Sequence, residues 1–378
     1  MSSKPAGSAP KDTLLRVMAE NAKPDQFPAG LTAEDIKRMY EGMILIRAYD
    51  ERQKNLQRSG RIGFCVTSTG EEAVQVGTSH ALEANDWVYP YYRQYGIMLY
   101  RGVPLNVLAN HLYGNEGDLA KGRQMPAHYT HRDTHFVSSS SVIGTHLIQA
   151  AGTAMAAKYK KDPSVTVTYI GDGGTSSNDF HSAMTFAGVF KPPMVLFIVN
   201  NQYAISLPVA KQCGAETLHS KGVGYGVPAI RVDGNDVFAV YQASREAYAR
   251  ARAGEGPTLI ELFTYRAGPH SSSDDPTRYR GNEAESWLSE DKDPIARARR
   301  YMQSLGIWTE AYENQVWEEA RTRINLATSE AEATAEPSWD SLFEDVYAEL
   351  PPALIRQRDE LIEKESGFER QHEGEFPL

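Results

Sequence analysis

The chain of 378 residues has little of three things: cysteine, positive charge and long apolar runs. Its only cysteines are Cys65 and Cys213, so no disulfide framework is implied, and a reducing cytoplasm fits. The formal net charge of −10 argues against a nucleic-acid-binding surface. No apolar stretch approaches the roughly 20 residues of a membrane span. We therefore expect a cytoplasmic enzyme with neither nucleic-acid nor membrane partners.

The first 30 residues also lack the features of a targeting segment. They are rich in Ala, Pro, Lys and Ser, without the apolar core of a signal peptide. They carry the acidic residues Asp12, Glu20 and Asp25, unlike an Arg-rich transit peptide. We predict that residues 1–30 form a mobile arm with a short helical patch at Asp12–Asn21.

Beyond this arm, apolar β-branched runs alternate with segments typical of helices. Strands are expected at 86–92, 165–170, 194–199, 229–232 and 258–265, and helices at 31–60, 72–83, 94–114 (interrupted near Gly102), 145–160, 178–190 and 237–253. The stretch 115–141 has no sustained period, so a long ordered loop is expected there. The alternation predicts an α/β fold, a doubly wound parallel sheet over residues 31–290. Residues 291–378 are charged and helical in pattern.

Two polar motifs follow the two most apolar strands. Gly171-Asp172-Gly173 comes directly after one strand, and Asn200-Asn201 comes after the next, with a spacer of 26 residues from Gly174 to Val199. A right-handed strand-helix-strand unit brings both strand ends to one edge of the sheet, so Asp172 and Asn201 should converge. A carboxylate beside an amide oxygen suits Mg²⁺, and the glycines allow backbone N–H groups to approach a diphosphate.

Two other interpretations of these motifs remain open. One is a tight strand-to-helix turn followed by an Asn-rich loop, without a ligand. The other is a Rossmann nucleotide site, which requires Gly-x-Gly-x-x-Gly, whereas Ser176 occupies the final position. A Rossmann site also leaves Asn200-Asn201 unexplained.

The paired motifs resemble the thiamine diphosphate motif, GDG followed by NN. From about Leu31 to Glu365 the chain is similar to the alpha subunit of the decarboxylating component of 2-oxo acid dehydrogenase complexes. Lys121-Gly-Arg-Gln-Met-Pro-Ala-His128 resembles the branched-chain subfamily. His270-Ser-Ser-Ser-Asp-Asp275 and Tyr279-Arg280 match it too, although bacterial pyruvate enzymes share part of this second segment. The resemblance implies a thiamine diphosphate-binding fold with helical extensions.

The resemblance also implies roles for individual residues. Mg²⁺ would be held by Asp172, Asn201 and the carbonyl of Tyr203. Residues implied in cofactor binding are Tyr92, Arg93, Ser141, Ile143, Gly171, Asp172, Gly173, Gly174, Asn201, Tyr203, Ile205 and His270. Those implied in catalysis are His270, Ser141 and Tyr92. Those implied at the substrate are Phe64, Tyr92, Met125, Pro126, Ala127, His128 and Ser141. Arg266, Asp274, Tyr279 and Arg280 are expected to form a polar network within the loop after His270.

Some features depart from the family's pattern or suggest other sites. Relatives often carry Arg where this chain has Val199, so one phosphate contact is absent or replaced. Val142 and His146 stand where potassium-binding relatives have Pro and Gln, and we carry over no potassium site. The spacing of His128, His131 and His135 would suit a metal on a helix, but Pro126 argues against a helix there. Whether serines of the 271–280 loop are phosphorylated cannot be deduced from the sequence.

The length of the chain suggests a partner. A thiamine enzyme generally needs a second α/β layer to activate the aminopyrimidine, and both layers together usually exceed about 500 residues. The missing surface is expected from a beta subunit in an α2β2 heterotetramer. The acyl group of a small 2-oxo acid would pass to a lipoyl acyltransferase core. A pyruvate dehydrogenase alpha subunit, a nucleotide-dependent reductase and a non-catalytic assembly subunit are the alternatives.

Overall fold

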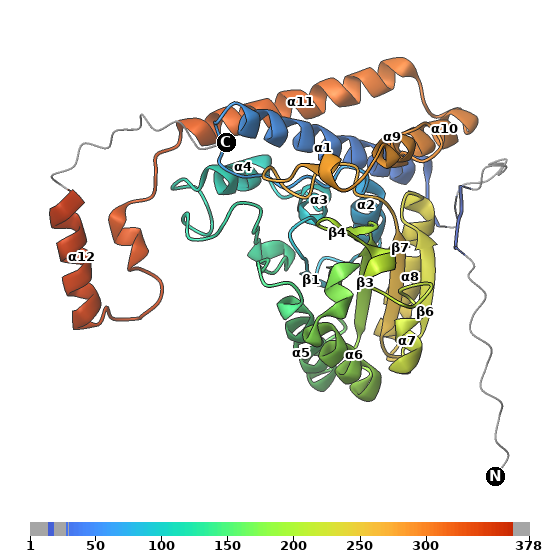
Figure 1. Ribbon diagram of the computed structural model, residues 1–378, viewed down its shortest axis with the longest axis horizontal. Helices are drawn as coiled ribbons and strands as arrows, with labels where there is room; N and C mark the ends of the chain where they lie inside the picture. The colour runs from blue at the N-terminus through green and yellow to red at the C-terminus, as the bar shows by residue number, and fades with distance from the viewer. Residues whose placement is uncertain (1–13, 19–27, 29, 366–378) are drawn as a thin grey trace, which may run out of the picture.

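The structure is a computed structural model that describes residues 14–18, 28 and 30–365 (Figure 1). Its centre is a parallel sheet in the order β1-β2-β3-β7-β6. The strands are β1 (Trp87–Tyr89), β2 (Thr166–Gly171), β3 (Met194–Asn200), β6 (Ala229–Asp233) and β7 (Thr258–Phe263). The predicted doubly wound sheet is confirmed.

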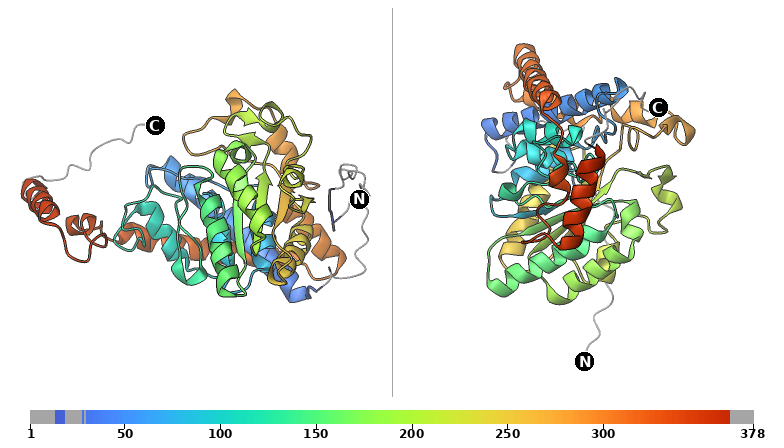
Figure 2. Two further views of the ribbon diagram at one scale, coloured as in Figure 1. Left: turned by 90° about the horizontal axis from the view of Figure 1, so that it is seen from below. Right: turned by 90° about the vertical axis from the view of Figure 1, so that its left-hand side faces the viewer.

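Helices cover both faces of this sheet (Figures 1 and 2). Alternate residues of the central strands enter two separate cores, because successive side chains of a strand point to opposite faces. Tyr169 and Phe197 belong to the larger core, whereas Ile170 and Ile198 belong to the smaller one. The helices against the larger core are α1 (Ala33–Arg58), α2 (Glu72–His80), α3 (Tyr95–Tyr100), α4 (Leu105–Tyr113) and α8 (Val237–Arg252). Those against the smaller core are α5 (Thr145–Lys160) and α6 (Asn178–Phe190).

Local signals explain where several helices begin. Thr32 caps α1 with the expected capping box, in which Asp35 bonds back to the Thr32 backbone. Ser177 caps α6, and Asp236 caps α8 with two backbone bonds. The remaining helices of four residues or more are α7 (Lys221–Gly224), α9 (Glu283–Trp287), α10 (Pro294–Ser304), α11 (Glu310–Ala333) and α12 (Pro352–Glu365). The pattern-based positions of the main elements are therefore confirmed.

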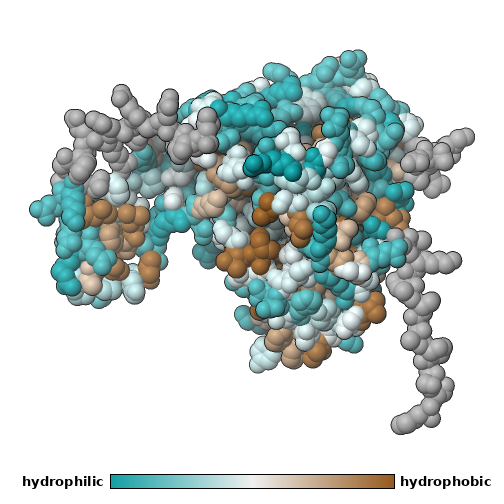
Figure 3. Space-filling model, in the orientation of Figure 1, coloured by the Kyte–Doolittle hydropathy of each residue, from teal (hydrophilic) through white to brown (hydrophobic). Residues whose placement is uncertain are grey.

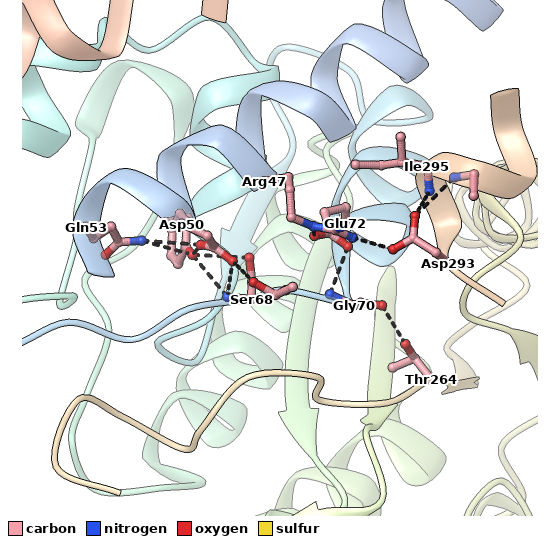
Figure 4. Close-up of polar contacts among 12 residues, drawn as sticks. Arg47, Asp50, Gln53, Ser68, Gly70, Glu72, Thr264, Asp293 and Ile295 are labelled. Atoms are coloured by element: carbon pink, nitrogen blue, oxygen red, sulfur yellow. Dashed lines mark hydrogen bonds and ion pairs between the residues drawn. The ribbon is translucent and has the colours of Figure 1, made fainter. Parts of the chain in front are cut away.

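Buried charges fasten α1 to the start of α2 and to α10 (Figure 4). Arg47 contacts Glu72 and donates from Nη2 to Asp293 at 2.8 Å. Glu72 accepts from the backbone N–H of Gly70 at 2.9 Å. Thr264, just past β7, donates to the Gly70 carbonyl at 3.0 Å. This network fixes the turn that leads into α2 beside the ends of the strands.

The N-terminal segment is only partly described, and one prediction about it is wrong. Residues 14–18 are not helical: Leu15 forms a parallel bridge with Val232 of β6, and Met18 is buried. The Leu15 N–H and carbonyl bond to Arg231 and Asp233, so pairing with the edge strand replaces the expected helical turn. The rest of the predicted arm lies mostly outside the described residues.

Two smaller features complete the architecture. A short antiparallel hairpin, β4 (Tyr203–Ala204) with β5 (Leu207–Pro208), follows β3. Helix α12 stands away from the main body (Figures 1 and 2). Within the part of the chain that the structure describes, no helix combines the length and apolarity needed to cross a bilayer.

Candidate active site

The site lies where the parallel strands end. Gly171, the last residue of β2, pairs with Val199 of β3, so the residues after both strands emerge side by side. Asp172 then opens a 3-10 turn at Gly173–Ser176. A Cβ on Gly173 would lie 2.4 Å from the Cβ of Ala204, so only glycine allows the β4–β5 hairpin this close. The predicted convergence of the two motifs is present.

A cavity of about 620 Å³ opens at this edge. Every residue predicted to bind the cofactor lines it, as do the three predicted catalytic residues: Tyr92, Arg93, Ser141, Ile143, Gly171, Asp172, Gly173, Gly174, Asn201, Tyr203, Ile205 and His270. They come from the ends of three strands and from the loops before α3 and α5. The structure therefore gathers residues that are up to about 180 positions apart in sequence.

Asp172 is the buried carboxylate of the cavity. It is 2 % exposed, and Gln212 donates to its Oδ2 at 2.5 Å. Burial raises the pKa of Asp172 to about 6, opposed by the hydrogen bonds it accepts and by the charge of Arg266. A carboxylate whose charge is disfavoured by burial is suited to a cation, which would restore the lost solvation.

Asn201 is oriented by a second buried carboxylate. Its Nδ2 donates to Glu71 Oε1 at 2.7 Å, and Tyr91 donates to the other Glu71 oxygen at 3.2 Å. The amide oxygen is thereby turned away from Glu71, where it accepts weakly from the Tyr203 N–H at 3.4 Å. Burial raises the pKa of Glu71, while the charge of Arg93 opposes that shift.

Two buried arginines supply positive charge. Arg93 is 1 % exposed and donates to the carbonyls of Thr67 and His270 at 2.5 and 2.7 Å. Arg266, also 1 % exposed, donates to the carbonyls of Tyr203 and Ile205 at 3.1 and 2.7 Å. Ile205, whose carbonyl accepts from Arg266, has φ +54°, a strained value for a β-branched residue. The proposed metal-binding carbonyl of Tyr203 thus already accepts one hydrogen bond.

His270 sits against both Tyr92 and Arg93. Its ring packs edge-on to Tyr92, with centroids 5.8 Å apart, and its Nδ1 lies 3.2 Å from Arg93 Nη2. Burial, with the charges of Arg93 and Arg266, lowers the pKa of His270 to about 3. Because a guanidinium can only donate, Nδ1 accepts and the ring hydrogen is on Nε2. His270 is therefore a neutral donor.

The loop after His270 is held by its own polar network, as predicted. Tyr279 donates to Asp274 at 2.6 Å and accepts from Arg266 at 2.7 Å. Arg280 donates to the carbonyls of Arg266, Ala267 and Gly268. Asp274 also caps the His270 N–H at 2.6 Å. These bonds fix the path of the loop beside the cavity.

The structure does not bring the other predicted substrate residues to the cavity wall. Phe64 packs against the large core, Ala127 is 1 % exposed within it, and Met125 is 47 % exposed. Pro126 and His128 are not on the wall either, although His128 contacts Ser141 from behind. Ala127 itself has a left-handed backbone, with φ +67°. Their role at a substrate stays a prediction.

Other residues of the site were not predicted. Tyr91, Ser176, Ser177, Ala204, Gln212 and Arg266 also line the cavity, and Glu71 supports it. Gln212 lies 40 residues beyond Asp172 in the sequence, and no local pattern predicts the contact between them. Glu71 had a local signal, since it directly follows Gly70 at the predicted start of α2. Among the described residues, no group of three or more His, Cys, Asp or Glu side chains could hold a metal, so the histidines of the 128–135 segment form no such site.

The donor set suits a magnesium diphosphate. Asp172 and the oxygens of Asn201 and Tyr203 are hard ligands, and Mg²⁺ shares such ligands with phosphate oxygens. Arg93 and the Nε2–H of His270 can donate to those oxygens. A parallel sheet whose strand ends carry an acid and an amide beside a buried arginine is typical of α/β enzymes that bind a diphosphate. The fold and the site therefore indicate this class of protein.

Comparison with known proteins gives the family. The model of the dehydrogenase E1 component matches residues 40–339, and the chain belongs to this thiamine diphosphate-dependent family. It is 41 % identical over 331 residues to the mouse mitochondrial 2-oxoisovalerate dehydrogenase subunit alpha, covering 88 % of this chain and 75 % of that protein. The Caenorhabditis elegans counterpart is 44 % identical over 326 residues, 86 % and 75 % of the two chains. The Staphylococcus aureus pyruvate dehydrogenase E1 component subunit alpha is 42 % identical over 360 residues, 94 % of each chain.

Proposed function

We propose that this chain is the alpha subunit of a branched-chain 2-oxo acid dehydrogenase. It would decarboxylate 2-oxo acids oxidatively and pass the acyl group to a lipoyl arm of an acyltransferase core. The observation that carries the proposal is the convergence of Asp172 and Asn201 beside buried Arg93 at the strand ends. The likeness to 2-oxoisovalerate dehydrogenase alpha subunits supports the substrate class.

Each residue then has a role in holding the cofactor. Asp172, Asn201 and the Tyr203 carbonyl would bind Mg²⁺, while Arg93 and His270 would donate to the diphosphate. When bound, thiamine diphosphate supplies the carbanion and the electron sink for decarboxylation. The protein's part is to neutralise the diphosphate, orient the reactive ring and keep bulk water out.

The rest of the site would come from a beta subunit in an α2β2 assembly. Apolar side chains stay exposed near the cavity, with exposed fractions of 66 % for Val142, 54 % for Ile205 and 42 % for Leu207. Figure 3 shows apolar side chains gathered on the face of the main body seen there. A large exposed apolar patch marks an interaction surface. We place the assembly in the cytoplasm, consistent with the scarcity of cysteine.

A pyruvate dehydrogenase alpha subunit is the second candidate. The Staphylococcus aureus pyruvate enzyme matches a larger share of the chain than the mouse protein does, at similar identity. A nucleotide-dependent reductase or a non-catalytic assembly subunit would instead bind no thiamine diphosphate.

Substrate competition tests these alternatives. The chain should be co-expressed with a beta subunit, and turnover of 2-oxoisovalerate compared with that of pyruvate. We expect a higher kcat/KM for 2-oxoisovalerate. Preference for pyruvate would reassign the substrate, and binding of NAD without Mg²⁺ or thiamine diphosphate would reject the proposal.

A further inference from the structure

The hydroxyl group of Ser141, on the cavity wall, forms a hydrogen bond with the ring of His128. Ser141 Oγ lies 2.6 Å from His128 Nε2. His128 is 5 % exposed, whereas Ser141 faces the open cavity. Either atom of this contact could carry the hydrogen, and its position determines whether Ser141 donates to a ligand in the cavity or accepts from it.

The other nitrogen of His128 answers that question. His128 Nδ1 lies 3.2 Å from the carbonyl oxygen of Pro126. A carbonyl oxygen has no hydrogen, so Nδ1 must donate to it. In neutral His128 the Nε2 atom is then the acceptor, and the Ser141 hydroxyl must donate to it.

A second histidine, with an aspartate behind it, anchors the backbone of His128. The backbone N–H of His128 donates to His111 Nε2 at 3.1 Å, so the hydrogen of His111 is on Nδ1. That atom donates to Asp118 Oδ1 at 3.0 Å. Although burial raises it, the pKa of Asp118 is held below its usual value by bonds from His111 and from the N–H groups of Ala120 and Gly122. Asp118 is therefore an ionised acceptor, and the Asp118–His111 pair fixes the loop segment that carries His128.

We propose that His128 is a positioning residue that takes the hydroxyl hydrogen of Ser141, so that Ser141 presents only lone pairs to the cavity. Ser141 then accepts from an N–H or O–H of the bound ligand instead of donating to it. The inference rests on the proposed function for the identity of that ligand, thiamine diphosphate, but the placement of the hydrogen does not. It makes His128, whose backbone is held by the Asp118–His111 pair, a part of ligand recognition.

A double-mutant cycle tests the coupling. Mg²⁺–thiamine diphosphate affinity should be measured by calorimetry on the complete enzyme with its partner subunit, for S141A, H128F and the double variant. We expect each single change to weaken binding about tenfold and the double variant to be no weaker than the worse single one. H128Q retains an acceptor and should recover most of the affinity.

Controls separate positioning from a structural effect. His131 lies in the same loop and contacts Thr134, away from the cavity, so H131F should leave the affinity unchanged. Additive losses in the cycle, or an affinity unaffected by S141A, would overturn the inference. The nitrogen shifts of labelled His128 in the same enzyme, assigned with H128Q, give a ligand-independent reading. Hydrogen on Nδ1 supports the inference and hydrogen on Nε2 overturns it, even if the cofactor proves to be another molecule.

Discussion

At the scale of single residues, the cavity is governed by opposite effects of burial on acids and bases. Burial raises the pKa of Asp172 and lowers that of His270, so in both groups burial opposes the charged form. Arg93 reinforces the second effect because its guanidinium contacts the imidazole. A magnesium diphosphate would fit both groups: the cation would favour the charged carboxylate of Asp172, and the phosphate oxygens would accept the Nε2 hydrogen of neutral His270.

Replacing Asp172 with alanine should cost affinity for the cofactor. It removes the only carboxylate proposed for Mg²⁺, and with it much of the charge that holds the metal on the diphosphate. We expect thiamine diphosphate affinity to fall at least tenfold, about 1.4 kcal/mol, with the fold intact. Calorimetry at fixed Mg²⁺ measures this. Glu255→Ala is a matched control, because Glu255 is an exposed acid outside the cavity. Unchanged affinity in Asp172→Ala would refute the metal assignment.

The low pKa of His270 should appear in the stability of the ligand-free chain. The folded-state pKa of about 3 lies below the usual value of about 6.5, so the unfolded chain binds a proton that the folded chain refuses. This contribution is complete above pH 6.5 and is lost as the pH falls toward 3. Between pH 6.5 and 5, we expect the unfolding free energy to fall about 1 kcal/mol more in wild type than in His270→Gln, allowing for partial exposure.

Urea titrations at several pH values measure that difference. His131→Gln, in another loop, should keep the wild-type dependence. Parallel pH profiles for wild type and His270→Gln would show that His270 is not held neutral.

At the scale of elements, the sequence predicts what periodicity and capping control. The helix at Thr145–Lys160 and the capping box at Thr32 follow from local patterns, and the structure has both. The strand order does not follow, because β7 lies between β3 and β6 through long-range pairing that no local pattern encodes. The same holds for Gln212, which reaches Asp172 only because the β4–β5 hairpin folds back over the site.

The site residues also divide into those that local patterns predict and those that only long-range contacts determine. Residues directly after predicted strands, such as Asp172 and Asn201, could be placed at the sheet edge from topology alone. Arg93 and His270 also follow predicted strands, but their roles toward the cofactor come from family resemblance, and the structure brings the two side chains together. The residues at 125–128 lie in an irregular loop whose path depends on Asp118 and on left-handed turns, so their distance from the cavity could not be deduced.

The loop at 270–280 should depend on Arg280 more than on a ligand. Its guanidinium donates to three successive carbonyls, at 2.9 Å for Ala267 and 2.8 Å for Gly268. Arg280→Ala leaves these part-buried acceptors without the guanidinium, so we expect proteolysis of the loop to accelerate at least tenfold. Arg278→Ala is the matched control, since Arg278 is exposed in the same loop. Equal protection in the two variants during limited proteolysis would contradict the role of Arg280.

Thiamine diphosphate with Mg²⁺ should add to this protection through His270. The alternative is that His270 only packs in the core and does not contact the cofactor. It predicts lower thermal stability in His270→Ala without a change in cofactor-dependent protection. Comparing digestion of wild type and His270→Ala with and without cofactor distinguishes the two.

At the scale of the whole molecule, we infer that the chain supplies one half of an active site. The strand ends would provide the diphosphate side, while apolar residues around the cavity and on α5 and α6 are exposed, with Val189 at 69 % and Tyr159 at 89 %. A chain that binds a charged cofactor beside uncovered apolar surface is suited to permanent assembly with another subunit.

The purified single chain should therefore show negligible decarboxylation and gain activity only with a beta subunit.

Leu207, on the β5 strand beside the cavity, is 42 % exposed and next to the proposed contact surface. Leu207→Glu places a charge there, so we expect association to weaken at least tenfold while the chain stays folded. Leu326→Glu on α11 is the matched control, because that leucine is also exposed, at 61 %, but on a helix that contributes nothing to the cavity wall. Sedimentation of the mixed subunits measures association, and turnover of 2-oxoisovalerate measures its consequence. Robust turnover by the single chain would reject the two-polypeptide site, whereas equal association of both leucine variants would reject only the proposed contact surface.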